Sequence, residues 1–158
     1  MLDFEKIVLR PLIHSDLQLL QKLENNKENW IFGSEEKEYT DKELLDYISK
    51  ARTDITIAKQ YRFVIEANES IGLIDLFDYN AASAFIGIII SKDYRNQGFG
   101  KQALKLLTNY AFNVLNLSKL YCIIKEDNFA SIRLFTACGF KLYTQKKEFQ
   151  YFVKLAEN

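Results

Sequence analysis

The chain of 158 residues has few of the side chains that build metal sites and disulfide frameworks. One histidine, His14, and two cysteines without a Cys-x-x-Cys pair are too few ligands for a structural zinc site. Cys122 and Cys138 are also too few for a disulfide framework, so we expect both as reduced thiols in the core. A Ser-His-Asp triad would have to use His14, and no nucleophile-elbow motif accompanies it. The sequence therefore predicts neither a bound metal nor triad-type catalysis.

Proline-rich, glycine-rich and long apolar segments are absent as well. With 1 Pro and 6 Gly, the chain does not fit collagen-like or low-complexity classes. The first residues lack the basic stretch and apolar run of a signal peptide. The longest apolar run, residues 84–90, is far below the roughly 20 residues that span a bilayer. We therefore expect a cytoplasmic protein with no membrane partner.

What the chain does have is the composition of one globular domain, residues 1–158. Hydrophobic residues make up 48% and charged residues 27%, which excludes a disordered chain. Lys+Arg and Asp+Glu are both 21, and the basic residues form no single stripe, so we expect no nucleic-acid partner. The charges are uneven, with 8 basic and 12 acidic residues up to Asp54, and 13 and 9 after it. This asymmetry fits either two ligand surfaces of opposite charge or chance.

Apolar periodicity predicts an α/β (α+β) fold with a mixed central sheet of about seven strands and about four helices on its faces. Ser15-Asp16-Leu17-Gln18 and Thr40-Asp41-Lys42-Glu43 have the spacing of capping boxes that open two helices. Gly139 fits a left-handed helix end. The passage from Phe85 to Ile124 predicts a right-handed parallel strand–helix–strand crossover. Its two strands, residues 84–90 and 120–124, are apolar throughout and are expected to be buried on both faces.

A short loop with two glycines joins the strand that ends at Ile90 to the next helix. Its sequence is Arg95-Asn96-Gln97-Gly98-Phe99-Gly100-Lys101. Glycines let the backbone approach a ligand, and the first-turn N–H groups of a helix attract anions. The loop is neither a P-loop nor a dinucleotide fingerprint, because Gly-Lys-Ser/Thr and a third glycine are missing. The residues alone predict an anion site or an ordinary strand-to-helix turn.

Two motifs in the correct order resemble the GNAT superfamily of N-acetyltransferases. Arg95, Gly98 and Gly100 fill the Arg/Gln-x-x-Gly-x-Gly/Ala pattern of its acetyl-CoA loop. Residues 128–140 are similar to its Asn-x-x-Ser-x-x-x-Tyr-x-x-x-Gly-Phe helix. Residues 8–12 and 115–120 favour the branch that holds ribosomal-protein N-terminal and spermidine acetyltransferases. The resemblance covers nearly the whole chain and implies a GNAT-like fold.

The resemblance also implies a function and a set of site residues. It implies an acetyl-CoA-dependent N-acetyltransferase whose acceptor, a protein N-terminus, a polyamine or another small primary amine, attacks the thioester directly. Homodimers are common in this branch. The strand that ends at Ile90 is expected to pair with the pantetheine arm, and backbone N–H groups of the loop to hold the pyrophosphate. The implied acetyl-CoA-binding residues are Ile88, Ile89, Ile90, Arg95, Asn96, Gln97, Gly98, Phe99, Gly100, Lys101, Asn128, Ser131 and Phe135.

Three positions depart from the family pattern. Phe135 replaces the tyrosine that usually protonates the departing thiolate, Phe85 replaces a glutamate of the spermidine branch, and Gln102 replaces an acidic residue. A general acid is typically worth about 10²–10⁴-fold, so its loss slows an enzyme without necessarily abolishing catalysis. The alternative function is a catalytically impaired CoA-binding or interaction domain of the same fold.

The candidate catalytic residues are Glu148, Ser131 and Asn128. Glu148 lies where the branch often places a glutamate, although a solvated charge in a hairpin explains it as well. Ser131 could donate a proton in place of the missing tyrosine. Asn128 could reach the acetyl end, and it also fits a helix N-cap. A group of acidic residues could attract the cationic acceptor or form a solvated loop: Glu35, Glu36, Glu38, Asp41 and Glu43.

Overall fold

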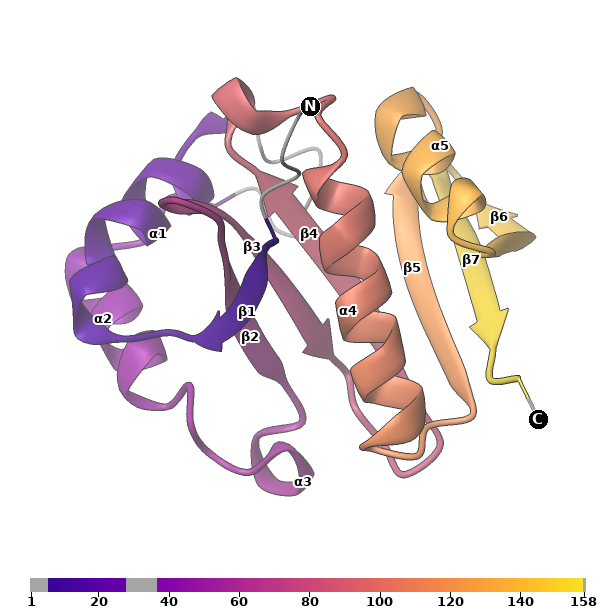
Figure 1. Cartoon of the computed structure of the whole chain (residues 1–158), viewed down its shortest axis with the longest axis horizontal. Helices are drawn as coiled ribbons and strands as arrows, with labels where there is room; N and C mark the ends of the chain where they lie inside the picture. The colour runs from indigo at the N-terminus through magenta and orange to yellow at the C-terminus, as the bar shows by residue number, and fades with distance from the viewer. Residues whose placement is uncertain (1–5, 28–36, 158) are drawn as a thin grey trace.

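The structure is a computed structural model that describes residues 6–27 and 37–157 (Figure 1). Glu35 and Glu36 lie outside these residues. The strands are β1 (Val8–Pro11), β2 (Tyr61–Glu66), β3 (Ser70–Phe77), β4 (Ser83–Ile90), β5 (Lys119–Lys125), β6 (Lys141–Lys146) and β7 (Phe149–Leu155). The α-helices are α1 (Leu17–Glu24), α2 (Asp41–Ser49), α3 (Ile55–Ala58), α4 (Phe99–Asn113) and α5 (Phe129–Ala137). Two 3₁₀ turns are η1 (His14–Asp16) and η3 (Lys92–Tyr94).

All seven strands form one mixed sheet in the order β1-β2-β3-β4-β5-β7-β6. Among these seven strands only β4 and β5 are parallel neighbours, and α4 connects them, which confirms the parallel pairing of the predicted crossover. The last strand, β7, lies between β5 and β6, an order that periodicity did not predict. Five α-helices occur in the described residues rather than about four, because the single turn of α3 is too short to give a periodic pattern.

The sheet separates two apolar cores. Ile74 and Leu76 of β3 pack with α4 and α5 in the larger core, whereas Leu73 packs with α1 and α2 in the smaller one. Alternate side chains of a strand point to opposite faces, so the two helix pairs cover opposite faces of the sheet. Figure 1 shows α4 lying along β4 and β5, with α5 beside the ends of β5 and β7.

The expectation that β4 and β5 are buried on both faces was wrong. Buried residues alternate with half-buried ones along most of β4, and with partly or well exposed ones along β5. Leu120 and Cys122 are buried under the helices, whereas Ile123 is 37% exposed on the other face. An apolar run therefore does not by itself distinguish one covered face from two.

One predicted capping box is confirmed and one was wrong. Thr40 Oγ1 accepts from the Glu43 N–H at 3.2 Å, and the Thr40 N–H donates to Glu43 Oε1 at 3.1 Å. Ser15 is no N-cap, because it lies within η1 and α1 begins only at Leu17. Asp16 takes the N-cap position, but its carboxylate accepts hydrogen bonds from Arg10 and from the Ile13 N–H instead.

The remaining local expectations concern cysteines and a helix end. Cys122 and Cys138 are buried free thiols, as expected. Gly139 follows α5 with a φ of +92°, which confirms the left-handed helix end. None of the helices within residues 6–27 and 37–157 is long and apolar enough to cross a membrane. The same residues contain no group of three or more His, Cys, Asp or Glu side chains placed to hold a metal ion.

Candidate active site

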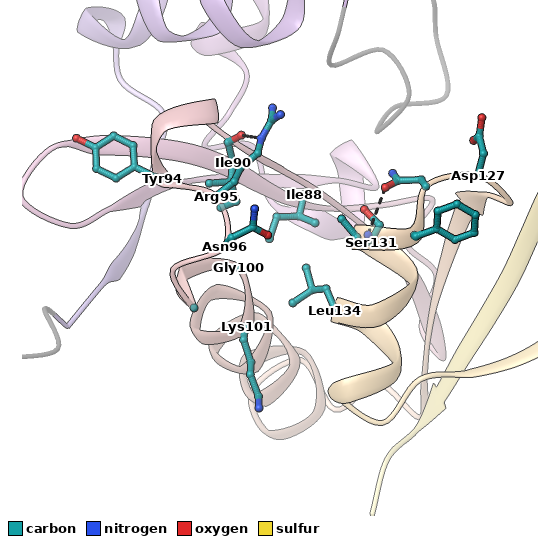
Figure 2. A pocket seen from close by; sticks show the side chains of 14 residues that line it. Ile88, Ile90, Tyr94, Arg95, Asn96, Gly100, Lys101, Asp127, Ser131 and Leu134 are labelled. Atoms are coloured by element: carbon teal, nitrogen blue, oxygen red, sulfur yellow. Dashed lines mark hydrogen bonds between the residues drawn. The ribbon is translucent and has the colours of Figure 1, made fainter.

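The central feature of the sheet is an opening between β4 and β5. The two strands pair only over residues 83–85 and 119–121, and beyond these positions they separate. A cavity of about 500 Å³ lies at the open end (Figure 2). Its walls come from the end of β4, the start of α4 and the start of α5: Ile88, Ile90, Tyr94, Arg95, Asn96, Gly98, Gly100, Lys101, Asp127, Asn128, Phe129, Ala130, Ser131 and Leu134. Separated strands leave backbone N–H and C=O groups of β4 available to a ligand.

The loop before α4 presents the positive end of that helix to the cavity. Gly98 occupies the N-cap with a φ of +86°, a conformation that favours glycine. A Cβ built on Gly98 would meet no atom within 4 Å, so the space above it is open. The first turn of α4 contains no acidic residue that would neutralise the N–H groups. This end of α4 is therefore suited to an anion such as a phosphate.

Arg95 stabilises the loop as well as adding charge. Its Nε donates a hydrogen bond of 2.8 Å to the carbonyl oxygen of Ile90, and Figure 2 shows this contact. The side chain is half-buried beside the cavity. Its guanidinium thus links the end of β4 to the loop.

Gly100 permits close packing of two helices. A Cβ there would stand 3.3 Å from Leu134 Cδ2 and 3.9 Å from Ile88 Cδ1. The missing side chain lets the start of α4 approach α5 across the cavity floor. The second glycine of the motif therefore has a packing role in addition to lining the cavity.

Four predicted acetyl-CoA residues do not line the large cavity. Ile89 points to the opposite face and packs against the smaller core. The side chain of Gln97 bonds the carbonyl of Asp93 at 2.8 Å, and Phe99 packs edge-on against Tyr94. Phe135 is buried below the cavity. The structure brings together the other nine: Ile88, Ile90, Arg95, Asn96, Gly98, Gly100, Lys101, Asn128 and Ser131.

Asn128 is the N-cap residue of α5 and also forms part of the wall of the large cavity. Its Oδ1 accepts from the Ser131 N–H at 3.3 Å, which confirms the N-cap. The residue is only 5% exposed, and its amide nitrogen makes no hydrogen bond within the described part of the chain. The N-cap thus fixes an amide group that faces the cavity.

A second, small cavity of about 20 Å³ lies deeper between β4 and β5 and shares Ile88, Asn128 and Ser131 with the large one. Such a volume holds about one water molecule. Its walls also include Gly87, Cys122 and Phe135. Phe135 packs edge-on against Phe140 with ring centroids 5.1 Å apart and offers no proton donor. Burial raises the pKa of the Cys122 thiol, which therefore stays protonated at neutral pH.

The predicted acidic residues that the structure describes line neither of these cavities. Glu148 is exposed in the turn between β6 and β7, where its carbonyl accepts from the Glu126 N–H at 2.8 Å. Asp41 accepts from Gln21, and Glu38 is exposed. Glu43 caps α2 and pairs with Lys37; these hydrogen bonds hold the pKa of Glu43 below its usual value. Local contacts thus account for Asp41 and Glu43.

Sequence reasoning overlooked one ionic group on the other face of the sheet. Arg62 of β2, Asp75 of β3 and Glu24 of α1 form ion pairs there. The sequence carried a weak signal for it: a charged residue within the apolar strand 71–76, where an unpaired charge is costly.

Known proteins with a similar sequence or structure indicate the family of this chain. Residues 6–141 match the sequence model described as the acetyltransferase (GNAT) domain. The spermidine N(1)-acetyltransferase of Escherichia coli strain K12 is 35% identical over 139 residues, which cover 86% of this chain and 73% of that protein. The corresponding enzyme of Vibrio cholerae is 30% identical, covering 85% and 79%. A crystal structure of spermidine N-acetyltransferase from Vibrio cholerae in complex with CoA and spermine superposes with a TM-score of 0.83 at 26% identity, covering 95% of each chain.

Proposed function

Because the chain belongs to the GNAT family of acetyltransferases and is an acetyl-CoA-dependent N-acetyltransferase, we propose that its acceptor is a polyamine such as spermidine. Two relatives that match most of the chain are named spermidine N(1)-acetyltransferases. Family membership favours the enzyme over the alternative of an impaired CoA-binding domain. A protein N-terminus and other small amines are the competing acceptors.

The observation that carries the cosubstrate site is the 500 Å³ cavity at the open end of β4 and β5. The first-turn N–H groups of α4, with Asn96 to Lys101 around them, would hold the pyrophosphate of acetyl-CoA. The open edge of β4 at Ile88 and Ile90 would pair with the pantetheine arm. The amide of Asn128 would then meet the far end of this arm, close to the small cavity.

The chemistry of transfer is direct attack of the neutral amine on the thioester carbon. A simple thiol has a pKa near 8.5, so a thiolate leaves at neutral pH with modest assistance. The Ser131 hydroxyl, or a water in the small cavity beside it, would supply the proton that Phe135 cannot. Holding amine and thioester together contributes about 7–11 kcal/mol on its own.

Two further features stay predictions. One Vibrio cholerae spermidine N-acetyltransferase structure is described as dodecameric, and we propose that this chain also forms a homo-oligomer. The cytoplasm, a reducing compartment, would suit the two buried free thiols. Size-exclusion chromatography with light scattering tests the first proposal, and a monomer at micromolar concentration would exclude it.

Two measurements test the proposed function. Calorimetry should show acetyl-CoA binding, and the absence of binding at millimolar concentration would exclude the site. Thiol release should then be followed with spermidine, spermine, N-terminal peptides, amino acids and aminoglycosides as acceptors. The highest kcat/KM should belong to a polyamine. A higher kcat/KM for a peptide N-terminus would contradict the polyamine proposal and identify a protein N-terminus as the acceptor.

A further inference from the structure

A charged group lies between the sheet and the helices α1 and α2, on the face opposite α4. Arg62 pairs with Glu24, and its Nη2 lies 3.6 Å from Asp75 Oδ2. The guanidinium also lies over the ring of Tyr47, 5.0 Å from the ring centroid. Each of the three charged side chains is 15–18% exposed. One arginine thus faces two carboxylates from different elements of the fold.

Asp75 differs from Glu24 because Gly87, which has no side chain, is its neighbour on β4 and separates it from the opening of the sheet. In the register of β3 and β4, Asp75 pairs with Gly87, one of the residues that line the small cavity between β4 and β5. A Cβ built on Gly87 would stand 2.7 Å from Asp75 Oδ1, so the carboxylate occupies the space that a side chain there would fill. The ion pair with Arg62 uses the other oxygen, Oδ2, so Oδ1 is the one that lies over Gly87.

Aromatic rings continue the same surface away from Asp75. The same Cβ on Gly87 would lie 3.6 Å from Phe77 Cε1, so the ring and the carboxylate meet above the glycine. Phe77 stacks on Phe85 with ring centroids 5.6 Å apart, and Phe85 packs on Tyr121 at 5.2 Å. All three rings are half-buried. A carboxylate beside partly exposed aromatic faces is suited to an alkylammonium group.

We propose that Asp75 binds the reacting ammonium group of the acceptor and takes its proton, with Phe77 and Phe85 as the wall of that site. This proposal rests on the proposed function, because it assumes that acetyl transfer occurs at the opening of β4 and β5. The acceptor then approaches from the α1/α2 face, and acetyl-CoA occupies the cavity on the α4 side. The amine then meets the thioester beside Gly87, through the opening between β4 and β5.

The environment of Asp75 favours proton uptake. Burial raises its pKa, and the negative charge of Glu24 on α1 adds to this, whereas Arg62 on β2 opposes it. Tyr47 on α2 completes the group and faces Arg62. The net pKa of Asp75 lies above its usual value, which makes the carboxylate a better base than an exposed aspartate.

The proposed step balances in atoms and charge. The ammonium group gives one proton to Asp75, and the nitrogen lone pair then forms the C–N bond to the acetyl carbon. The C–S bond breaks, and the second proton lost by the nitrogen ends on the CoA sulfur through Ser131 or water. Asp75 returns its proton to solvent, so the products are the acetylamine, CoA thiol and one released proton.

The variant Asp75→Asn keeps the shape of the side chain and removes the base. We expect acetyl-CoA binding to stay within about twofold, while kcat/KM for spermidine falls about 10²–10⁴-fold. The pH profile is the readout that a merely structural role would not change. In the parent, activity falls as pH drops through the raised pKa of Asp75. The variant should lose this dependence and gain rate steadily as rising pH supplies neutral amine.

Glu24→Gln is the matched control, because it removes the other carboxylate beside Arg62 but lies away from Gly87. It should keep the fall of activity in acid, moved to lower pH because the Glu24 charge that helps to raise the pKa of Asp75 is gone, and stay within about threefold in kcat/KM at the pH optimum. If Asp75 is only a partner of Arg62, the two variants should lose activity alike, and that result would overturn the proposal. An Asp75→Asn protein that binds acetyl-CoA and turns over spermidine within threefold of the parent would overturn it as well.

Further comparisons apply if Asp75→Asn does not fold or if the parent does not acetylate spermidine. If Asp75→Asn does not fold, Gly87→Ala decides, because its Cβ would displace the carboxylate; unchanged turnover in this variant would contradict the proposal. If the parent acetylates another amine but not spermidine, the polyamine assignment fails, and the same variants are compared on that amine. A parent that acetylates no amine while binding acetyl-CoA would overturn both proposals.

Discussion

Arg95 donates a hydrogen bond from Nε to the carbonyl oxygen of Ile90, five residues earlier, at 2.8 Å. The contact spans the turn between β4 and the loop before α4, and both residues line the large cavity. An arginine expected to add positive charge also fixes the shape of the site. Its two roles have different consequences when salt or the side chain is changed.

Arg95→Ala should weaken acetyl-CoA binding about 3- to 10-fold, the range expected for the net contribution of one hydrogen bond. Arg95→Lys keeps the charge but lacks the Nε donor. Compared with Arg95→Ala, it should recover only the salt-sensitive part of the lost affinity. Calorimetry at low and high salt separates the two contributions. Full recovery of affinity in the lysine variant at high salt would argue against the positioning role.

Gly98→Ala should weaken acetyl-CoA binding at least about 10-fold, because the cradle of N–H groups depends on the left-handed conformation at this position. Gly139→Ala is the matched control: its φ of +92° is similar to the +86° of Gly98, but it lies at the other end of α5. Each variant should lose about 1–2 kcal/mol of unfolding free energy. Only the first should lose affinity. Equal affinities of the two folded variants would contradict the site.

Phe135→Tyr should raise kcat by up to about 10²-fold if departure of the thiolate limits the rate, because it returns a proton donor to the small cavity. The KM for acetyl-CoA should not change, since the ring stays in place against Phe140. Steady-state kinetics with thermal denaturation of the same samples provide the test. A folded variant with unchanged kcat would show that another group protonates the sulfur or that another step is limiting.

Asp16→Asn should destabilise the protein at neutral pH and much less in acid. Burial of the Asp16 carboxyl opposes its ionisation, but hydrogen bonds from Arg10 and the Ile13 N–H outweigh this and lower its pKa below 3.8. A lowered pKa in the folded state means that the stabilisation is complete above 3.8 and is lost as pH falls through the folded value. We expect a loss of about 1–3 kcal/mol near pH 7.

Urea denaturation of parent and variant over the acid range measures this difference. Asp46→Asn is the control, because the Asp46 carboxylate pairs with Lys50 at an exposed position and should contribute less than about 0.5 kcal/mol. A deficit of Asp16→Asn that stays constant down to the lowest pH would show that shape, rather than charge, is responsible.

The sequence by itself determined the features that depend on neighbouring residues. The two glycines after Ile90, the Asn-x-x-Ser start of α5 and the alternation of strands and helices report local backbone requirements. Periodicity predicted the parallel crossover, and the resemblance carried by these motifs implied the nine residues that line the large cavity. The N-cap role of Asn128 follows from the same local rule, because its acceptor group and the Ser131 N–H are three residues apart.

Only the tertiary structure decided which distant residues meet. The insertion of β7 between β5 and β6, and the position of Glu148 outside the cavities, depend on strand order. The approach of Asp75 to Gly87 depends on the register of β3 against β4, and the pairing of Glu24 with Arg62 on the docking of α1. Local periodicity gives the face of each side chain, but strand register and helix docking are set by packing between segments far apart in the chain.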